Sequence, residues 1–248
     1  MKILGIIPAR YNSTRFPGKP LALLGNKPII QWVYEKSALA IEDICVATDD
    51  ERIFDCVNNF GGQAVITSLK HQSGTDRCRE ALEIMETMNQ SHYKIVVNIQ
   101  GDEPFIDPKQ IRQLIDLFND PNTQIATLAK EITVESDIFD PNRPKVVTDI
   151  NGFALLFSRS PIPFIRNSHK DDWINTFKYF KHIGIYAYKS EILRKISMLT
   201  PSSLEIAESL EQLRWLENGY RIKIGHTPFE NIGIDTPEDL ELAKKLIS

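Results

Sequence analysis

Three cations lie in a short segment that follows a predicted buried strand near the start of the chain. Arg10, Arg15 and Lys19 come after the apolar run 3–7, and Ser13 and Gly18 lie among them. Open α/β sheets build phosphate sites at the carboxyl ends of their strands. Cations, hydroxyls and backbone N–H groups all bind phosphate oxygens. The segment is therefore predicted to bind phosphate; the alternative is a solvated basic loop.

Two aspartates are candidates to hold a metal ion. Asp102 follows the predicted strand 95–99, and Asp235 precedes the predicted last helix, 238–246. Carboxylates at such an edge can hold Mg²⁺, which commonly sits between one or two carboxylates and substrate phosphates. Asp102 could instead start a turn, and Asp235 could simply cap the helix. Their separation in sequence leaves open whether they share a metal.

Two further segments carry polar groups suited to ligand binding. Ser73 and Gly74 open the predicted helix 75–88 and could present N–H groups and a hydroxyl to a base or phosphate. A simple helix cap is the alternative. Period-two alternation in the predicted strand 180–188 puts His182 and Tyr186 on one face, which suits a hydroxyl-rich ligand or an ordinary strand surface.

The elements that must position these residues follow an alternating pattern. Apolar strands are predicted at 2–7, 44–47, 64–66, 95–99 and 125–129, and helices at 28–39, 51–59, 75–88 and 108–118. This alternation is typical of an α/β fold with a doubly wound, mostly parallel sheet.

The pattern changes near residue 140. The predicted strands 145–148 and 153–157 flank Asn151-Gly152, a hairpin turn signal. A helix is then predicted over 202–217, with Glu208, Glu211 and Gln212 on one face. We predict one domain, 1–248, with an antiparallel lid or dimerisation lobe at about 140–190.

Composition excludes several classes of protein. The chain has 248 residues, a formal net charge of −4 and 42% hydrophobic residues, whereas a nucleic-acid binder is usually basic. Three scattered cysteines argue against zinc or a disulfide framework. Neither a Gly-x-Gly-x-x-Gly nor a Walker loop is present. With no apolar run long enough to span a bilayer and no signal segment, we expect no membrane partner and a cytoplasmic protein.

Eight segments together resemble one family, the 3-deoxy-manno-octulosonate (Kdo) cytidylyltransferases. The first reads Pro-Ala-Arg-Tyr-x-Ser-Thr-Arg-x-Pro-Gly-Lys, and a later one reads Asn-Ile-Gln-Gly-Asp-Glu-Pro. The matching segments run in order along essentially the whole chain: 7–21, 46–49, 71–77, 97–104, 157–159, 182–186, 210–214 and 235–240. One such segment would be weak, but eight in series are highly specific.

The resemblance implies a nucleotide-diphospho-sugar transferase fold, a homodimer and a Mg²⁺-dependent reaction of CTP with Kdo that gives CMP-Kdo and pyrophosphate for lipopolysaccharide synthesis. By position, it implies catalytic roles for Lys19, Arg10, Asp102 and Asp235, with both aspartates on Mg²⁺. It implies nucleotide binding by Arg10, Ser13, Arg15, Lys19, Gln72, Ser73 and Gly74. It implies sugar binding by Gln100, Arg159, His182, Tyr186, Glu211 and Gln212.

Two alternatives remain at the level of the sequence. The same reaction could act on 8-amino-Kdo or another acid sugar, since an amine in place of a hydroxyl needs only one changed contact. A non-catalytic CTP-binding sensor could keep the fold. Retention of Lys19 with both Asp102 and Asp235 argues against the sensor, because binding alone would tolerate the loss of a metal carboxylate.

Overall fold

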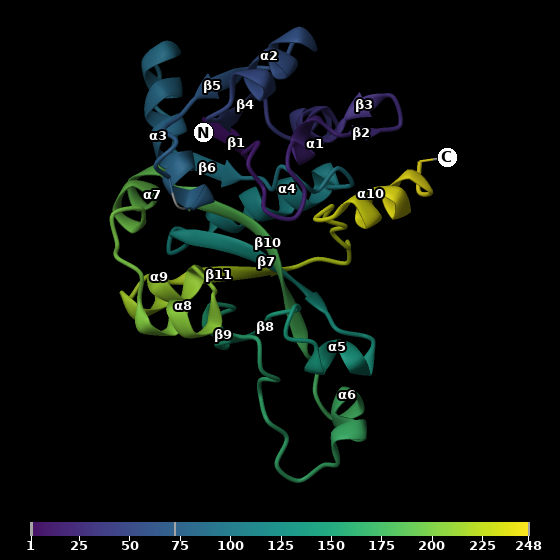
Figure 1. Ribbon diagram of the computed structural model, residues 1–248. Helices are drawn as coiled ribbons and strands as arrows, with labels where there is room; N and C mark the ends of the chain where they lie inside the picture. Colours follow the sequence, from purple (N-terminus) through teal and green to yellow (C-terminus); the bar gives the residue numbers. More distant parts are fainter. Residues whose placement is uncertain (1, 72, 248) are drawn as a thin grey trace. The chain divides into compact units, whose positions relative to one another are not determined.

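The computed structural model describes residues 2–71 and 73–247 and has the predicted α/β fold with a mostly parallel, doubly wound sheet (Figure 1). The chain divides into two compact units. The first comprises 1–115, 187–197 and 231–248, and the second comprises 116–186 and 198–230. The prediction of one domain with a lobe at about 140–190 stays a prediction.

The first unit is built on four parallel strands in the order β6-β1-β4-β5. These strands are β1 (Ile3–Ala9), β4 (Asp43–Thr48), β5 (Ala64–Ile66) and β6 (Ile95–Asn98). The chain moves from β1 outward to β4 and β5 and then returns to the other side of β1 as β6. The strand order therefore reverses between β1 and β6, which is where open α/β sheets bind ligands at the carboxyl ends of the strands.

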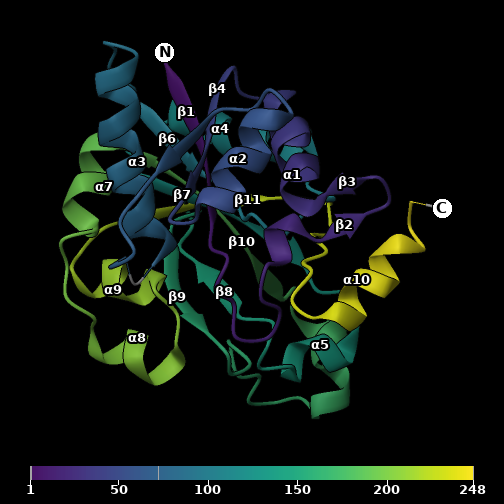
Figure 2. The same ribbon diagram turned by 45° about the horizontal axis from the view of Figure 1, so that its top comes forward.

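Helices cover both faces of this four-stranded sheet. Figure 2 shows α3 and α7 on one side of it and α1 and α2 on the other. The helices of this unit are α1 (Ile29–Ala38), α2 (Glu51–Asn59), α3 (Gly74–Met88), α4 (Pro108–Asp116), α7 (Ser190–Ile196) and α10 (Pro237–Lys244). A short hairpin, β2 (Leu23–Leu24) and β3 (Lys27–Pro28), lies between β1 and α1 in the sequence. The buried strands carry almost only apolar side chains, as a sheet covered on both faces requires.

The second unit mixes parallel and antiparallel pairs. Strand β11 pairs with β7 in parallel, whereas β8 pairs antiparallel with β9 and β10. The predicted hairpin 145–157 is confirmed: Gly152, at φ +75°, turns the chain between β8 and β9. The strands are β7 (Ile125–Glu131), β8 (Lys145–Thr148), β9 (Ala154–Ser158), β11 (Ile222–His226) and β10 (Phe180–Lys189), of which residues 187–189 belong to the first unit. The helices are α5 (Glu135–Phe139), α6 (Trp173–Thr176), α8 (Ser203–Glu208) and α9 (Gln212–Glu217).

Two sequence predictions about the elements are wrong. Strand β1 does not end at Ile7 but continues through Pro8 to Ala9, paired with β4. The ladder with β6 ends at Ile6, so the missing N–H of Pro8 costs no hydrogen bond on that side. The predicted helix 202–217 is two helices, because Ser209 adopts a left-handed conformation with φ 51°.

Within the described residues, no helix combines the length and the apolar character needed to cross a membrane.

Candidate active site

The cationic loop after β1 is held in shape by its own residues. The backbone N–H groups of Ser13 and Gly18 both donate to the carbonyl oxygen of Tyr11, at 3.0 and 2.8 Å. Gly18 has φ +73°, and a Cβ there would lie 3.1 Å from the Tyr11 ring. The Arg52 guanidinium stacks on that ring at 3.3 Å from its centre. A side chain at position 18 would therefore disturb the loop, which needs glycine here.

This loop delivers Lys19 to both predicted metal-binding aspartates. The Lys19 Nζ donates to Asp102 Oδ2 at 2.7 Å and to Asp235 Oδ1 at 3.1 Å. The Lys19 side chain is only 11% exposed, so its charge is partly shielded from water. Arg15 makes a second ion pair with Asp235, at 3.1 Å. Both aspartates therefore converge on one cation, the Lys19 ammonium, and that they share a metal ion stays a prediction.

Two backbone contacts bring the aspartates together. A Cβ on Gly101 would lie 2.8 Å from the carbonyl oxygen of Pro8, so only glycine lets the segment after β6 lie this close to β1. The Ile234 N–H donates to the carbonyl oxygen of Asp102 at 2.9 Å. This bond joins residues 132 positions apart in the sequence. It holds the segment that contains Asp235 beside Asp102.

A third carboxylate, Glu103, lies in the same acidic group. Burial, followed by the charges of Asp102 and Asp235, raises the pKa of Glu103 to about 8, although a hydrogen bond from the Asn231 amide acts in the opposite direction. Sequence reasoning did not assign a role to Glu103 or Asn231. The position of Glu103 next to Asp102 was the one signal that could have marked it.

The carboxylates present fit a hard divalent cation. Asp102 and Asp235 carry carboxylate oxygens that both reach the Lys19 ammonium, and oxygen is the ligand type that such a cation prefers. Across residues 2–71 and 73–247, no group of three or more His, Cys, Asp or Glu side chains is placed to hold a metal alone. A site of two carboxylates matches Mg²⁺, which completes its coordination with waters and substrate phosphates.

The N-terminus of α3 lies near the same loop. Ser73 caps the helix: its hydroxyl accepts from the Asp76 N–H at 3.2 Å, and the Asp76 carboxylate accepts from the Ser73 N–H at 3.3 Å. Arg10 Nη2 donates to the carbonyl oxygen of His71 at 2.7 Å. A Cβ on Gly74 would lie 3.7 Å from the Pro8 ring. Arg10, Ser73 and Gly74 therefore lie close together, while the predicted Gln72 lies outside the described residues.

The predicted site residues divide between the two units. The first unit holds Arg10, Ser13, Arg15, Lys19, Ser73, Gly74, Gln100, Asp102 and Asp235. The second unit holds Arg159, His182, Tyr186, Glu211 and Gln212.

Within the second unit, His182 and Tyr186 lie together on β10. Their ring centres are 5.3 Å apart, and Tyr186 also contacts Trp215 of α9 at 5.1 Å. His182 Nε2 lies 3.1 Å from the Thr127 hydroxyl, and burial lowers the pKa of His182 to about 3. The imidazole is therefore neutral at physiological pH and can donate or accept a hydrogen bond without carrying charge.

Arg159 and Glu208 form a separate contact at the end of α8. The Arg159 N–H donates to the Glu208 carboxylate at 2.8 Å, and its guanidinium donates to the Glu208 carbonyl oxygen at 2.6 Å. The Glu208 carboxylate is thus engaged with the end of β9, while Glu211 and Gln212 lie at the start of α9. The predicted shared helical face of Glu208, Glu211 and Gln212 is wrong, because the helix breaks between them.

Comparisons with known proteins agree on one class of enzyme. Residues 4–224 match a family model described as Cytidylyltransferase. A 3-deoxy-manno-octulosonate cytidylyltransferase of Bacteroides thetaiotaomicron is 56% identical over 250 residues, covering 100% of this chain and 98% of the relative. The protein of that name from Parabacteroides distasonis is 56% identical over 247 residues, covering 98% of this chain and 97% of the relative.

Solved structures give the same result. A CMP:2-keto-3-deoxy-manno-octonic acid synthetase complexed with CTP has a TM-score of 0.89 and 40% identity, covering 100% of this chain and 98% of the other. A 4-diphosphocytidyl-2C-methyl-D-erythritol synthase from Anaerococcus prevotii shares only 12% of its residues, with a TM-score of 0.62 and coverage of 99% and 98%. The second likeness shows the fold alone.

Proposed function

Because the chain belongs to the family of 3-deoxy-manno-octulosonate cytidylyltransferases, we propose that it transfers the cytidylyl group of CTP to Kdo and releases pyrophosphate. The observation that carries this proposal is the position of Lys19. Its ammonium group lies between Asp102 and Asp235, beyond the carboxyl ends of β1 and β6, where the strand order reverses. A cation beside two potential metal ligands suits a substrate that brings several phosphates.

In the proposed reaction the anomeric hydroxyl of the sugar attacks the α-phosphorus of CTP. The bond from this phosphorus to the bridging oxygen breaks, and pyrophosphate leaves. Such a transfer depends on positioning and charge neutralisation more than on covalent help from the protein. Lys19 would neutralise charge that grows on the bridging oxygen, and the planar guanidinium of Arg10 would hold phosphate oxygens in a fixed orientation.

Asp102 and Asp235 would hold Mg²⁺, which when bound neutralises phosphate charge and polarises the phosphoryl group. Ser13, Arg15, Ser73 and Gly74 are proposed to contact the nucleotide, as is Gln72. Gln100, Arg159, His182, Tyr186, Glu211 and Gln212 are proposed to contact the acid sugar. The neutral state of His182 supports this role, because a neutral imidazole can share a hydrogen bond with a sugar hydroxyl.

We also propose that the protein is a homodimer that works in the cytoplasm, where CTP is available. The exposed apolar pair Leu155 and Leu156 on β9 supports an interface in the second unit, because neighbouring exposed leucines are a common feature of protein contacts.

The test is pyrophosphate release with CTP and Mg²⁺, comparing Kdo, 8-amino-Kdo and a sialic acid side by side. We expect release with Kdo well above the other two. Release with 8-amino-Kdo alone would keep the reaction and change the substrate. CTP binding without release from any of the sugars would contradict the enzyme and support the non-catalytic sensor.

A further inference from the structure

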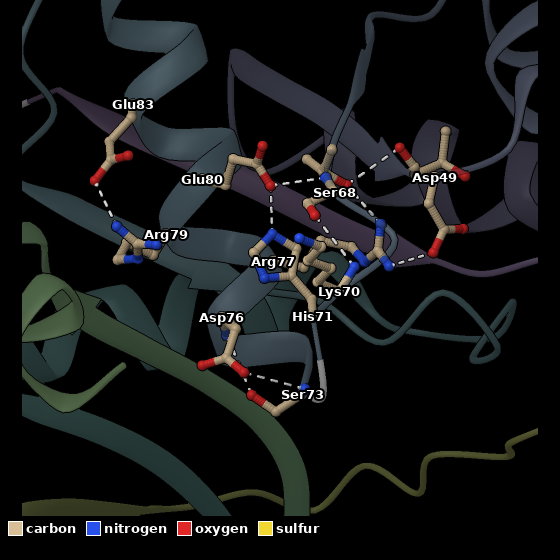
Figure 3. A network of polar contacts seen from close by, with 12 residues as sticks. Asp49, Ser68, Lys70, His71, Ser73, Asp76, Arg77, Arg79, Glu80 and Glu83 are labelled. Atoms are coloured by element: carbon tan, nitrogen blue, oxygen red, sulfur yellow. Dashed lines mark hydrogen bonds and ion pairs between the residues drawn. The ribbon is translucent and has the colours of Figure 1, made fainter. Parts of the chain in front are cut away.

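The segment that leads into α3 is fastened to that helix by two side chains, Arg77 and Glu80 (Figure 3). Arg77 is fully buried; its guanidinium donates to the Thr67 hydroxyl and, at 2.6 Å, to the Asp49 carboxylate. This contact joins the beginning of the segment to the end of β4. It is an interior ion pair whose loss would leave a buried charge without a partner.

Glu80 contacts the same segment, residues 67–71, at two later residues, Ser68 and His71. Its Oε2 accepts a hydrogen bond from the Ser68 N–H at 2.8 Å, and the same oxygen contacts the Nε2 of His71 (Figure 3). Burial would raise the pKa of Glu80. The hydrogen bonds from Ser68 and His71, with the nearby positive charges, outweigh it, so this pKa lies below its ordinary value. The carboxylate is thus ionised at neutral pH and accepts both bonds, and His71 Nε2 donates one of them.

His71 connects this contact to Arg10 of the cationic loop after β1. Its ring is held by Glu80, while its backbone carbonyl accepts the hydrogen bond from Arg10 Nη2 at 2.7 Å. Ser73, the N-cap of α3, follows two positions later. A movement of the His71 backbone would therefore shift both the Arg10 guanidinium and the chain that enters α3.

We propose that Glu80 is a positioning residue for nucleotide binding, which it serves by fixing His71 and thereby Arg10 and the start of α3. This inference rests on the proposed function, in which Arg10, Ser73 and Gly74 contact CTP. In this proposal Glu80 acts through Ser68 and His71 and not by contact with a substrate. Its effect reaches the nucleotide through the backbone of residues 68–71, whose geometry determines where Arg10 finds its carbonyl partner.

The structure offers a matched control on the same helix. Glu83 lies one turn after Glu80 and pairs with Arg79 at 3.1 Å on the surface, without contact to the segment 67–71 among the interactions of the described residues (Figure 3). It also offers a conservative replacement. One oxygen of Glu80 accepts both bonds, so the amide oxygen of a glutamine can take the same place.

The experiment compares Glu80→Ala, Glu80→Gln and Glu83→Ala with the unchanged protein. CTP affinity is measured by titration calorimetry without sugar, and the KM values for CTP and for Kdo are measured by pyrophosphate release. We expect Glu80→Ala to weaken CTP binding and raise the KM for CTP by about tenfold, because losing a charged hydrogen-bond partner lets the loop move. The KM for Kdo and kcat should change less than about threefold, as should every value for Glu80→Gln and Glu83→Ala.

The CTP affinities of the variants decide whether Glu80 positions the nucleotide-binding residues. If folded Glu80→Ala binds CTP as tightly as the unchanged protein, the proposal is overturned and Glu80 has only a structural role. Equal weakening by Glu83→Ala would also overturn it, because the effect would then not depend on the contacts of Glu80 with Ser68 and His71. Should Glu80→Ala fail to fold, Glu80→Asp, whose carboxylate is withdrawn by one methylene, gives the same comparison. An unchanged protein that binds CTP but releases no pyrophosphate would contradict the proposed function and leave the affinity comparison valid, whereas one that binds no CTP would overturn both.

Discussion

Lys19 is the side chain that brings the two predicted metal-binding aspartates of the first unit together. It reaches Asp102 at 2.7 Å and Asp235 at 3.1 Å while only 11% of its side chain stays exposed. The Lys19 ammonium is thus shielded from water, whereas Asp102 and Asp235 are 31% and 46% exposed, so solvent screens the two pairs in part. A residue held in this way is rigid, and rigid charges suit the stabilisation of charge that develops during a reaction.

We expect Lys19→Ala and Asp102→Asn each to lower kcat by about 10²- to 10³-fold, by analogy with the loss of one donor to a developing oxyanion. Lys27→Ala is the control, because Lys27 forms a comparable pair with Glu35 on the surface of the same unit. The measurements are pyrophosphate release with CTP and Kdo and, for stability, urea denaturation. Near-normal turnover in either site variant would contradict the assigned roles, as would a loss of stability large enough to unfold the protein.

The sequence predicted the residue types of this centre but not all of its members. Lys19, Asp102 and Asp235 stood out because each follows or precedes a predicted element, whereas their mutual contact was left open by the sequence and is seen only in the fold. Glu103 and Asn231 could not be predicted as partners, because they are 128 positions apart and their contact depends on the fold. For the same reason the bond from Arg10 to the His71 carbonyl, across 61 positions, has no sequence signature.

At the scale of elements, α10 fixes the position of Asp235. The Asp235 and Thr236 N–H groups both donate to Asp239 Oδ2, at 3.0 and 2.9 Å, and the Thr236 hydroxyl accepts from the Asp239 N–H at 3.2 Å. From its position in the sequence, Asp235 could be either a helix cap or a metal ligand. The structure assigns the cap to Thr236, which leaves the Asp235 carboxylate directed to Lys19 and Arg15.

Thr236→Ala is expected to lower the free energy of unfolding by about 1 kcal/mol, because it removes the side-chain acceptor of the N-cap. Thr236→Ser, which keeps the hydroxyl, should stay close to the unchanged protein. Urea denaturation monitored by circular dichroism measures both. Equal stability of the alanine and serine variants would show that the hydroxyl does not stabilise this helix.

Strand β10 carries a histidine whose burial makes stability depend on pH. Burial lowers the pKa of His182 to about 3, whereas an unfolded histidine titrates near 6.5. Between these values the unfolded chain binds a proton that the folded chain does not, so the free energy of unfolding falls as the pH falls.

From pH 7 to pH 5, linkage at this single group predicts a loss of about 2 kcal/mol of stability. His182→Gln, which keeps a hydrogen-bonding group beside Thr127, should remove that part of the pH dependence. The check is to measure the free energy of unfolding of both proteins at pH 7 and pH 5. If both proteins lose the same amount, His182 is not buried in its neutral form.

The break between α8 and α9 shows where pattern reasoning fails at this scale. Residues 202–217 have helical spacing throughout, but Ser209 is left-handed and Glu208 binds the Ser158 hydroxyl and the Arg159 N–H. These two hydrogen bonds, to residues about 50 positions away in the sequence, outweigh the small intrinsic helix propensity of residues 208–211. A periodicity argument includes only near neighbours, so it could not foresee this competition.

At the scale of the whole molecule, the alternation of strands and helices was sufficient to predict the fold class. Parallel strands that are covered on both faces must be apolar, and their connecting helices must be amphipathic. The order of strands and helices can therefore be recognised from the hydrophobic pattern of the sequence. The hydrophobic pattern does not predict which segments of the chain make up each of the two units. Segments 187–197 and 231–248 join residues 1–115 through contacts such as Ile234 N–H to the Asp102 carbonyl, which no local pattern encodes.

The proposed homodimer would use the exposed apolar side chains of β9. Leu155 and Leu156 are adjacent on β9 and both exposed, with 63% of Leu155 open to solvent. Apolar side chains grouped in this way favour burial against another chain, because removing them from water stabilises the contact. We expect a mass twice the 28.3 kDa of one chain in light scattering after size exclusion at micromolar concentration.

Replacing both leucines by glutamate should weaken this dimer by about 10- to 100-fold and shift the mass toward that of one chain, because charges would then face an apolar contact. Met88→Glu is the control, since Met88 is an exposed apolar side chain at the end of α3 in the first unit. A dimer that survives the double replacement would place the interface elsewhere. A protein that is monomeric before any replacement would contradict the dimer itself, and the exposed leucines would then be ordinary surface residues.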